Sequence, residues 1–417
     1  MTGLATLFAS ESSNGGDQSA STLVTALAVA IFVGAYVFIA TEWVHRVAAA
    51  LAGAALMVVI GATDAEAAFF SEETGVDWHV IFLLLGMMVI VGIIKQTGVF
   101  EYLAIWAAKR ARGRPYAILA MLCTITAVAS ALLDNVTTVL LIAPVTLLVC
   151  DRIGVRPEGF LIAEVIASNI GGTATLIGDP PNIIIASRAD LSFNDFVVNL
   201  APFVLIAFLV FLVLARWLFR RSFTYDAERA AAVMEVDERR AIRDPALLRR
   251  SLAVLGLVLV SFVLHSALHL EPSIVALLGA GLLVVVSRTS SAEFLEEVEW
   301  PTLVFFMGLF VMVGALVNIG VIGSLGEAAI DAVGDNYFVA ASGLLFGSAA
   351  LSGIVDNIPY VASMSPLVND LVGAGGDSVG ANALWWALAL GADLGGNATA
   401  VGASANVVVL GIAARSG

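Results

Sequence analysis

Residues 131–136 read Ala-Leu-Leu-Asp134-Asn135-Val, and residues 353–358 repeat the pattern as Gly-Ile-Val-Asp356-Asn357-Ile. Each is followed by a polar, glycine-rich stretch: Ser-Asn-Ile-Gly-Gly-Thr-Ala-Thr at 168–175 and Ala-Asp-Leu-Gly-Gly-Asn-Ala-Thr at 392–399. Carboxylates and amides are costly in hydrocarbon, so polar motifs in apolar surroundings indicate functional sites. Two such motifs that recur in the same order predict a transporter built from two related halves.

The composition predicts a helical membrane protein. Of 417 residues, 60% are hydrophobic and 13% charged, and the mean hydropathy is +0.97. Runs such as 201–218 are long enough to cross a bilayer. Because lipid cannot satisfy backbone groups, a spanning chain must be helical or form a closed barrel. These runs are apolar throughout and do not alternate, which favours an all-α polytopic membrane protein.

Charge and cysteine usage exclude several partners and cofactors. The net charge of −14 argues against nucleic-acid partners and leaves the lipid bilayer as the expected surroundings. Cys123 and Cys150 lie in apolar stretches with neither disulfide nor metal spacing, so we expect structural thiols and no bound cofactor. The sequence has no nucleotide-binding motif, so any pump ATPase is expected to be a separate chain.

The chain divides into four predicted regions. We expect a disordered tail over 1–20, a first transmembrane repeat over 21–219, a charged linker over 220–250 and a second repeat over 251–417. Trp78 maps onto Trp300 and Asp134 onto Asp356 with the same offset of 222 residues, and Gly171 maps onto Gly395 after an insertion. Agreement at so many special positions indicates an internal duplication.

The distribution of basic residues predicts the topology. The cluster over 109–114, Arg152, Arg156 and the linker carry most of the basic charge, whereas 63–77 and 189–197 carry none. By the positive-inside rule the linker is cytoplasmic, the amino terminus is outside, and the protein is a multi-pass protein of the plasma membrane. The second half then starts from the opposite side, so we expect inverted repeats working by alternating access.

Each repeat is expected to contain a hairpin and a broken helix. Segment 115–150 fits two full helices or a re-entrant hairpin, and we favour the hairpin, with Asp134 and Asn135 at its tip near the bilayer midplane. Segment 160–187 is predicted to break, because Gly171-Gly172 and Gly178-Asp-Pro-Pro181 cannot continue a regular helix. The corresponding segments of the second repeat are 337–372 and 383–412.

Asp134 and Asp356 are the leading candidates for ion or proton ligands. A carboxylate that binds a cation gives up its proton, so binding and proton release are linked. Asn135 and Asn357 add neutral oxygen ligands that suit a hard cation such as sodium, and no other metal is expected. The alternative is a structural role, in which each Asp-Asn pair caps the second helix of its hairpin.

The breaks supply further candidates for ion or substrate binding. They are Asn169, Thr173, Thr175, Asp179, Asn182, Asp393, Asn397, Thr399 and Asn406. Asn169 corresponds to Asp393, and Asp179 corresponds to Ala403, so the repeats differ in charge at both positions. Such differences can separate a coupling site from a substrate site. The alternative is that Asp179 and Asn182 only cap the helix that follows the break.

Three other polar positions have competing interpretations. Glu164 lies one helical turn before the polar stretch 168–175, where it either passes protons or pairs with an arginine. Lys95 ends an apolar segment and is expected to extend to the cytoplasmic interface. His265 and His269 have a spacing that suits a metal, but we favour an interfacial pair at the end of a segment.

These motifs resemble the arsenite permease and NhaD-type sodium–proton antiporter family of the ion transporter superfamily. Residues 130–141 and 162–182 are most similar to its P-protein-like branch. The resemblance covers nearly the whole chain and implies two re-entrant hairpins and two unwound helices around a central site, in a homodimer. It also implies a further helix after 383–412, so we expect the second repeat to lack its last helix.

The leading hypothesis is a secondary active transporter that exchanges sodium for protons and is not an enzyme. Intramembrane carboxylates without an intramembrane arginine favour a cation, although helix amino termini can replace arginine in an anion site. The alternative is therefore a permease for arsenite, antimonite or another, carboxylate-like anion. An intramembrane aspartyl enzyme and a channel are more remote. Asp134 and Asp356 are copies of one repeated position rather than a protease dyad.

Overall fold

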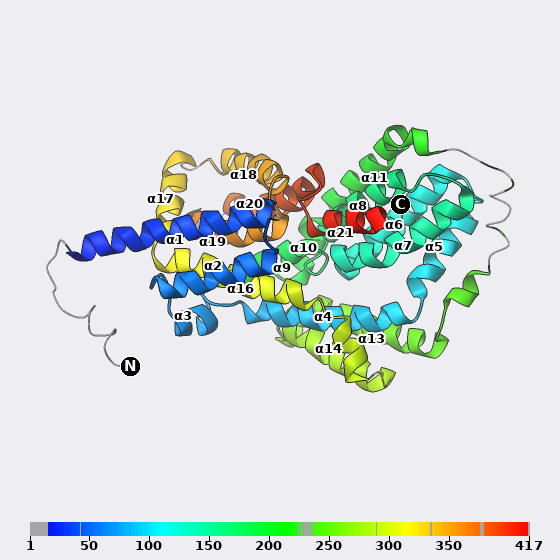
Figure 1. Cartoon of the computed structure of the whole chain (residues 1–417), viewed down its shortest axis with the longest axis horizontal. Helices are drawn as coiled ribbons and strands as arrows, with labels where there is room; N and C mark the ends of the chain where they lie inside the picture. Colours follow the sequence, from blue (N-terminus) through cyan, green and yellow to red (C-terminus); the bar gives the residue numbers. More distant parts are fainter. Residues whose placement is uncertain are drawn as a thin grey trace. The chain divides into compact units, whose positions relative to one another are not determined.

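The computed structural model describes residues 16–41, 43–223, 226, 228, 234, 237–288, 290–333, 336–375 and 379–415. In these residues every regular element is an α- or 3-10 helix, and seven helices are long and apolar enough to cross a membrane. The predicted all-α polytopic fold is therefore confirmed (Figure 1). Most of the tail expected over 1–20 and part of the linker expected over 220–250 lie outside the described residues.

The chain forms two compact units, of which the first comprises residues 1–76 and 304–328. It contains α1 (Gly16–Thr41), α2 (Arg46–Val59), α3 (Ala65–Phe70), most of α16 (Trp300–Asn318) and most of α17 (Val321–Val333). Glycines let α16 approach its neighbours closely: a Cβ atom at Gly308 would lie 2.9 Å from the carbonyl carbon of Ala50, and one at Gly314 would overlap the Thr74 carbonyl. Small residues at such contacts are typical of membrane helix packing.

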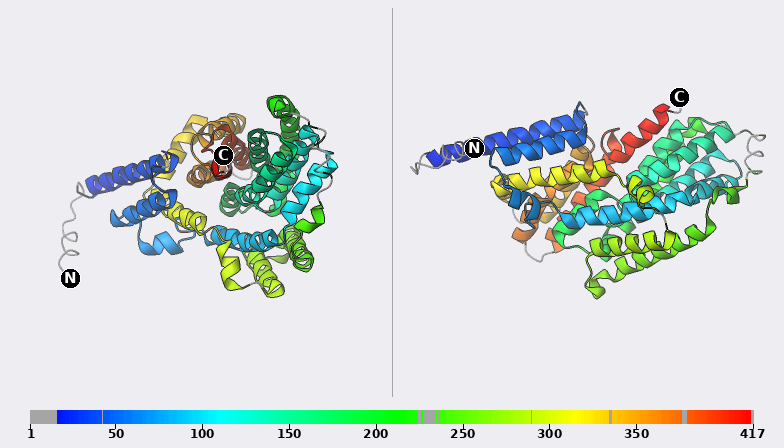
Figure 2. Two further views of the ribbon diagram at one scale, coloured as in Figure 1. Left: turned by 45° about the vertical axis from the view of Figure 1, so that its right-hand side comes forward. Right: turned by 60° about the horizontal axis from the view of Figure 1, so that its bottom comes forward.

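The second unit comprises residues 77–303 and 329–417 and holds both pairs of motifs. From the first half of the chain it contains α4 (Trp78–Gln96), α5 (Val99–Arg110), α6 (Pro115–Leu132), α7 (Asn135–Ile153), α8 (Glu158–Gly172), α9 (Pro180–Ala189), α10 (Phe193–Asn199), α11 (Ala201–Leu218), η1 (Arg220–Ser222) and η2 (Glu238–Ala241). From the second it contains α13 (Pro245–Leu268), α14 (Pro272–Ser287), α15 (Ser291–Glu296), α18 (Tyr337–Ser352), α19 (Asn357–Gly375), α20 (Val379–Gly395), η3 (Gly396–Ala398) and α21 (Ser404–Arg415). Helices α13 and α14 pack together beside α4 (Figure 2).

Both predicted hairpins form as helix–turn–helix units. Helices α6 and α7 are separated by only two residues, and the Asp134 carboxylate caps α7 by accepting a hydrogen bond from the Thr137 amide at 2.7 Å. Asp356 stands at the same place between α18 and α19. Because α6 and α7 are each long enough to span a membrane, re-entry of this hairpin stays a prediction.

Both predicted helix breaks are present. Helix α8 ends at Gly172 and α9 begins at Pro180, and α20 ends at Gly395 before α21 begins at Ser404. Close backbone packing fixes the end of α8, because a Cβ atom at Gly171 would lie 2.5 Å from the Ala127 Cα atom of α6. Likewise, a Cβ atom at Gly395 would lie 2.6 Å from the Ala349 Cα atom of α18.

Each short helix that follows a break packs against the other half of the sequence. Helix α9 packs on α19 and α20, and α21 packs on α7 and α8 (Figure 1). Ala405 and Val409 of α21 share a buried cluster with Val139 of α7 and Leu161 of α8. This exchange joins the two halves around their helix breaks.

Equivalent positions in the two halves make the same hydrogen bonds. The Ser130 hydroxyl donates to the Ser168 carbonyl at 2.7 Å, and its counterpart Ser352 donates to the Ala392 carbonyl at 2.6 Å. Thr175 donates to the Ala131 carbonyl and Thr399 to the Gly353 carbonyl, both at 2.5 Å. Each pair ties a break to the tip of the hairpin from its own half.

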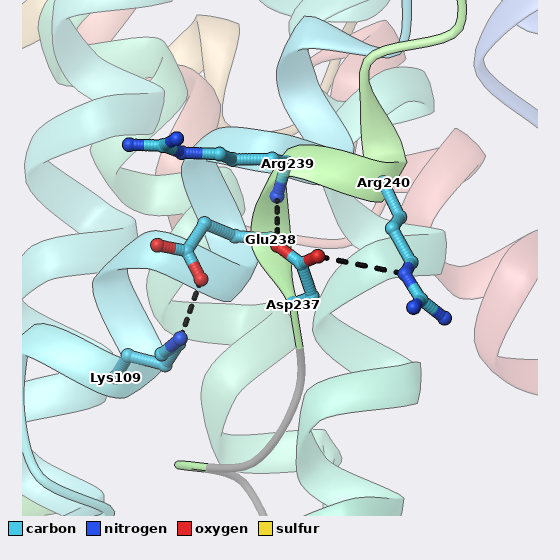
Figure 3. A network of polar contacts seen from close by, with 5 residues as sticks. All are labelled: Lys109, Asp237, Glu238, Arg239 and Arg240. Atoms are coloured by element: carbon cyan, nitrogen blue, oxygen red, sulfur yellow. Dashed lines mark hydrogen bonds and ion pairs between the residues drawn. The ribbon is translucent and has the colours of Figure 1, made fainter.

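The end of the linker is fastened to α5 (Figure 3). The Lys109 ammonium donates to the Glu238 carboxylate at 2.5 Å, and the Arg243 guanidinium donates to Glu101 at 2.7 Å. The Arg243 amide also donates to the Thr97 carbonyl at 2.9 Å. Gly98, with φ +79°, leaves room for the Ala241 carbonyl, which a Cβ atom there would overlap.

We expect Gly171→Val to destabilise the second unit, because the added side chain overlaps the Ala127 backbone. Overpacking of this kind costs about 1–3 kcal/mol, so the thermal unfolding midpoint of the detergent-solubilised protein should fall. Gly347→Val is the matched control, since nothing lies within 4 Å of a Cβ atom at Gly347 on α18. Equal midpoints for the two variants would contradict the close approach of α6 and α8.

We expect the fastening of η2 to α5 to weaken in acid. The hydrogen bond from Lys109 lowers the pKa of Glu238 below its ordinary value. The stabilisation is therefore present above the ordinary glutamate pKa of about 4.3, and it is lost as the pH falls through the lowered value. Amide hydrogen exchange over 238–243 should be faster in Glu238→Gln than in the parent at pH 7, and the two should converge near pH 3. Equal exchange at pH 7 would show that the ion pair does not hold the linker.

Candidate functional site

The residues predicted from the sequence to bind an ion or substrate come together where the two hairpin tips meet the two helix breaks. All of them belong to the second unit. Those that are buried are Asp134, Asn135, Asn169, Thr173, Thr175, Asp179, Asn182, Asn357, Asp393 and Asn406. Asp356 and Asn397 are half-buried, and Thr399 is exposed. The site is built from both halves of the sequence.

Asp179 lies between the two Asp-Asn motifs. Its carboxylate accepts a hydrogen bond from the Asn135 side-chain amide at 2.6 Å and a longer one from the Asn357 amide at 3.4 Å. Although Asp179 precedes α9, its carboxylate caps no backbone amide of that helix. The contacts therefore differ from those of the helix-capping alternative and connect one carboxylate to both hairpins.

Asn169 makes the second connection between the halves. Its side-chain oxygen accepts from Asn135 at 3.2 Å. Its amide donates to the side-chain oxygens of Asn397 at 3.0 Å and Asn406 at 3.1 Å. Every polar atom of this buried amide group is thus hydrogen-bonded, and the break in α20–α21 is tied to α8.

Asn182 and Asn406 hold the unwound backbone. The Asn182 amide donates to the carbonyls of Gly172 and Thr175 at 3.3 and 3.1 Å. The Asn406 amide donates to the carbonyls of Gly396 and Thr399, both at 2.8 Å. Carbonyl groups freed by a break need such partners where water is excluded. These two residues therefore have a structural role, beside any part in binding.

The carboxylates of Asp134 and Asp356 accept hydrogen bonds at the hairpin tips. Asp134 caps α7, and Asp356 accepts from the Ile358 amide at 3.0 Å and from the Ser404 hydroxyl at 2.6 Å. The capping contacts allowed by the sequence are thus present at both positions. The two residues still belong to the centre, because together with Asp393 they are the charged neighbours of Asp179.

Asp393 differs from the other carboxylates of the site. It is fully buried on α20, and neither of its oxygens has a hydrogen-bond partner among the described residues. The side chains of Thr173, Asn182 and Asn357 lie near it without meeting hydrogen-bond geometry. The side-chain oxygens of Asn135 and Asn182 are also unpartnered in this part of the chain. The unpaired amide and carboxylate atoms of the site are therefore all acceptors.

Such a set of oxygens is suited to a proton or to an alkali cation. Burying an ionised carboxylate without a partner is strongly unfavourable, so the arrangement calls for a compensating positive charge. Within the described residues, no group of three or more His, Cys, Asp or Glu side chains is placed to hold a metal ion together. A monovalent cation bound by amide and carboxylate oxygens fits the residues that are present.

Glu164 lies outside this centre, in the core formed by α6, α7 and α8. Its carboxylate accepts a hydrogen bond from the Thr146 hydroxyl at 2.5 Å, while its second oxygen has no partner among the described residues. None of the ion pairs in this part of the chain involves Glu164, so the pairing with an arginine is not found. Its role in proton transfer stays a prediction.

A cavity of about 610 Å³ adjoins the first break. It is lined by Leu176 of the unwound stretch, by His265 and His269, and by His79 of α4, a histidine that the sequence analysis did not single out. His265 Nε2 accepts a hydrogen bond from the Phe193 amide at 3.3 Å. The cavity gives the unwound stretch contact with the surface of the unit, and its histidines form no metal cluster within the described residues.

Comparison with known proteins identifies the family. The citrate transporter family matches residues 36–391, which include both hairpins and the first break. The chain belongs to this family. It is therefore a membrane transporter, and the predictions of a multi-pass membrane protein and of transport are confirmed at this level.

The relatives support the same assignment. An uncharacterized transporter of Mycobacterium tuberculosis is 58% identical over 394 residues, covering 94% of this chain and 92% of that protein. The 46 kDa membrane protein of Mycobacterium leprae is 53% identical over 394 residues, with the same coverage. The P protein of Homo sapiens is 35% identical over 477 residues, covering 96% of this chain and 57% of that protein.

The resemblance to P-protein-like sequences is confirmed by the human relative. The matching family is the citrate transporter family, whereas the narrower assignment to arsenite permeases and NhaD-type antiporters stays a prediction.

We expect Asp179→Ala to destabilise the protein more than Asp179→Asn. Alanine leaves the amides of Asn135 and Asn357 without their carboxylate acceptor, and an unsatisfied buried donor costs about 1–3 kcal/mol. Asparagine retains an acceptor oxygen and removes the charge beside Asp393. Thermal unfolding of both variants measures the difference, with the exposed Asp370→Asn on α19 as the control. Equal unfolding midpoints for the two Asp179 variants would show that these hydrogen bonds do not stabilise the fold.

Proposed function

We propose that the chain is a secondary active transporter in which a proton or sodium ion binds at Asp393 and Asp179 and drives transport by alternating access. The observation that carries the proposal is the fully buried Asp393 carboxylate, whose oxygens have no hydrogen-bond partner in the described part of the chain. A proton or sodium ion that binds reversibly to this carboxylate links the binding of one ion to the release of the other.

The surroundings of Asp393 favour a cation. The charged groups that act on Asp179 are three other carboxylates, Asp393, Asp356 and Asp134. None of the ion pairs within the described residues joins a basic side chain to Asp134, Asp179 or Asp393. Repulsion among these groups is relieved by protonation or by a bound cation.

The repeated contacts support alternating access. Equivalent serines and threonines tie each break to its own hairpin, and α9 and α21 are exchanged between the halves. We infer inverted repeats, with the amino terminus outside and the linker on the cytoplasmic side of the plasma membrane. A homodimer is part of the proposal and rests on the resemblance alone.

A carboxylate substrate is the second candidate, because the matching family is described as a citrate transporter. In that case the cation bound at Asp393 neutralises part of the charge of the anion and enters with it. Sodium–proton antiport and cation-coupled carboxylate uptake thus share one coupling site and differ in the cargo. Arsenite transport has no supporting observation beyond the resemblance.

The test uses the whole chain in proteoliposomes that contain a pH-sensitive dye. We expect sodium or lithium addition to drive proton movement in the parent, and Asp393→Asn to reduce the initial rate at least tenfold, because the amide can neither release a proton nor neutralise a cation. Asp370→Asn should transport like the parent, since Asp370 is exposed on α19. Labelled citrate, with and without a sodium gradient, is measured in the same vesicles.

Sodium-dependent citrate uptake that Asp393→Asn abolishes would favour the carboxylate cargo and retain the coupling site. Transport by the parent that Asp393→Asn leaves unchanged would overturn the role of Asp393. A flux that follows only the gradient of the transported ion, uncoupled from any second ion, would indicate a channel.

A further inference from the structure

A second cavity, of about 490 Å³, lies between α5 and the start of α6, away from the central site. Its wall combines two kinds of side chain. Arg110, Arg112 and Arg114 supply positive charge, and Trp106, Ala117 and Met121 supply apolar surface. None of these residues has a part in the proposed transport site.

The guanidinium groups of this cavity have no partner among the residues that the structure describes. No ion pair or side-chain hydrogen bond in the described part of the chain involves Arg110, Arg112 or Arg114. The adjacent Lys109 behaves differently, because its ammonium is paired with Glu238 of the linker (Figure 3). In a chain with 34 acidic and 20 basic residues, three neighbouring arginines that have no partner among the described residues indicate a site for an external anion.

The position of the arginines corresponds to a membrane surface. Arg114 is the N-cap of α6, and Pro115–Leu132 is one of the apolar helices long enough to cross a bilayer. Arg112, with φ 54°, and Gly113, with φ 67°, form the turn that joins α5 to α6. Where such a helix crosses the bilayer, its first residue lies near the interface, so the charged part of the cavity is expected at the depth of the phospholipid phosphates.

The apolar part of the cavity continues along the membrane-spanning helix. Ala117 and Met121 are four residues apart, so they share one face of α6, and Ala117 is two residues after Pro115, in the first turn of that helix. Trp106 of α5 is 40% exposed beside them, as is common for tryptophan at the edge of the hydrocarbon. A soluble phosphate ion gains nothing from contact with this apolar surface, whereas an acyl chain packs along it.

We propose that this cavity binds an anionic phospholipid, with its phosphate between Arg110, Arg112 and Arg114 and an acyl chain along Ala117 and Met121. Basic pockets next to transmembrane helices commonly bind anionic headgroups. The predicted topology places this site in the cytoplasmic leaflet. The proposal does not depend on which ion or substrate is transported.

The test measures lipid retention by native mass spectrometry after the purified protein is equilibrated with equal amounts of phosphatidylglycerol and phosphatidylcholine. The parent should retain phosphatidylglycerol preferentially. At about 1 kcal/mol for each arginine, the affinity should fall about fivefold for Arg112→Gln and on the order of a hundredfold for the triple Arg110→Gln, Arg112→Gln, Arg114→Gln variant. Arg152→Gln with Arg156→Gln is the matched control, because these arginines lie on the next predicted cytoplasmic loop and do not line the cavity.

Two further measurements separate a lipid from a free anion. Ala117→Phe fills the apolar wall and leaves the arginines in place, so it should weaken phosphatidylglycerol binding as well. Inorganic phosphate at millimolar concentration should not displace the lipid from the parent.

Undiminished retention by the triple variant, or equal loss in the Arg152/Arg156 control, would overturn the site. Displacement by inorganic phosphate, with no effect of Ala117→Phe, would show an anion site without a lipid. If the triple variant does not fold, the test rests on Arg112→Gln, which should lose about fivefold in phosphatidylglycerol affinity. An unchanged affinity in that variant, with thermal unfolding as the check on its fold, would overturn the site.

Discussion

The structure of the candidate site depends on how the backbone groups of the two helix breaks find hydrogen-bond partners away from water. Where α8 and α20 end, carbonyl groups lose their helical partners, and lipid offers no replacement. The amides of Asn182 and Asn406 each bond two of these carbonyls. Thr175 and Thr399 tie the breaks to the hairpin tips. Once the breaks are held in this way, the hairpin tips and the residues of both motifs must converge on one place.

The repeated and the unrepeated residues of the site have different roles. Several residues shared by the halves, namely Ser130 and Ser352 and likewise Asn182 and Asn406, bond the backbone. The acidic residues found in only one half are Asp179, which corresponds to Ala403, and Asp393, which corresponds to Asn169. Each half therefore contributes one unrepeated carboxylate to the centre, from a different position of the same scaffold. On the predicted duplication, the shared positions supply the framework, and the positions that differ between the copies add carboxylates to it.

Much of the framework could be predicted from the sequence, because the helix breaks and the hairpin turns each have a local chemical cause. Gly171-Gly172 and Gly178-Asp-Pro-Pro cannot continue a helix, and the break lies there. The two Asp-Asn motifs, placed within long apolar segments, predicted the hairpin turns. The exchange of α9 and α21 could not be predicted, since their apolar faces do not specify which half they will pack against. His79 was missed for a similar reason, as a single histidine in an apolar stretch gives no sign of the cavity it lines.

The ranking of the carboxylates shows a second limit of sequence analysis. Repetition draws attention to Asp134 and Asp356, but repetition also marks residues that any copy of the fold needs, and both are found at helix starts. Asp179 already accepts hydrogen bonds from Asn135 and Asn357, one from each hairpin, whereas Asp393 accepts none among the described residues. On the proposed function, an arriving proton or cation therefore gains more at Asp393 than at Asp179. Neutralising Asp393 also relieves its repulsion with the Asp179 carboxylate. Asp393 is part of α20, and Asp179 directly precedes α9. In the proposed mechanism, charge at this point acts on both helix breaks at once, and this is the coupling that alternating access requires.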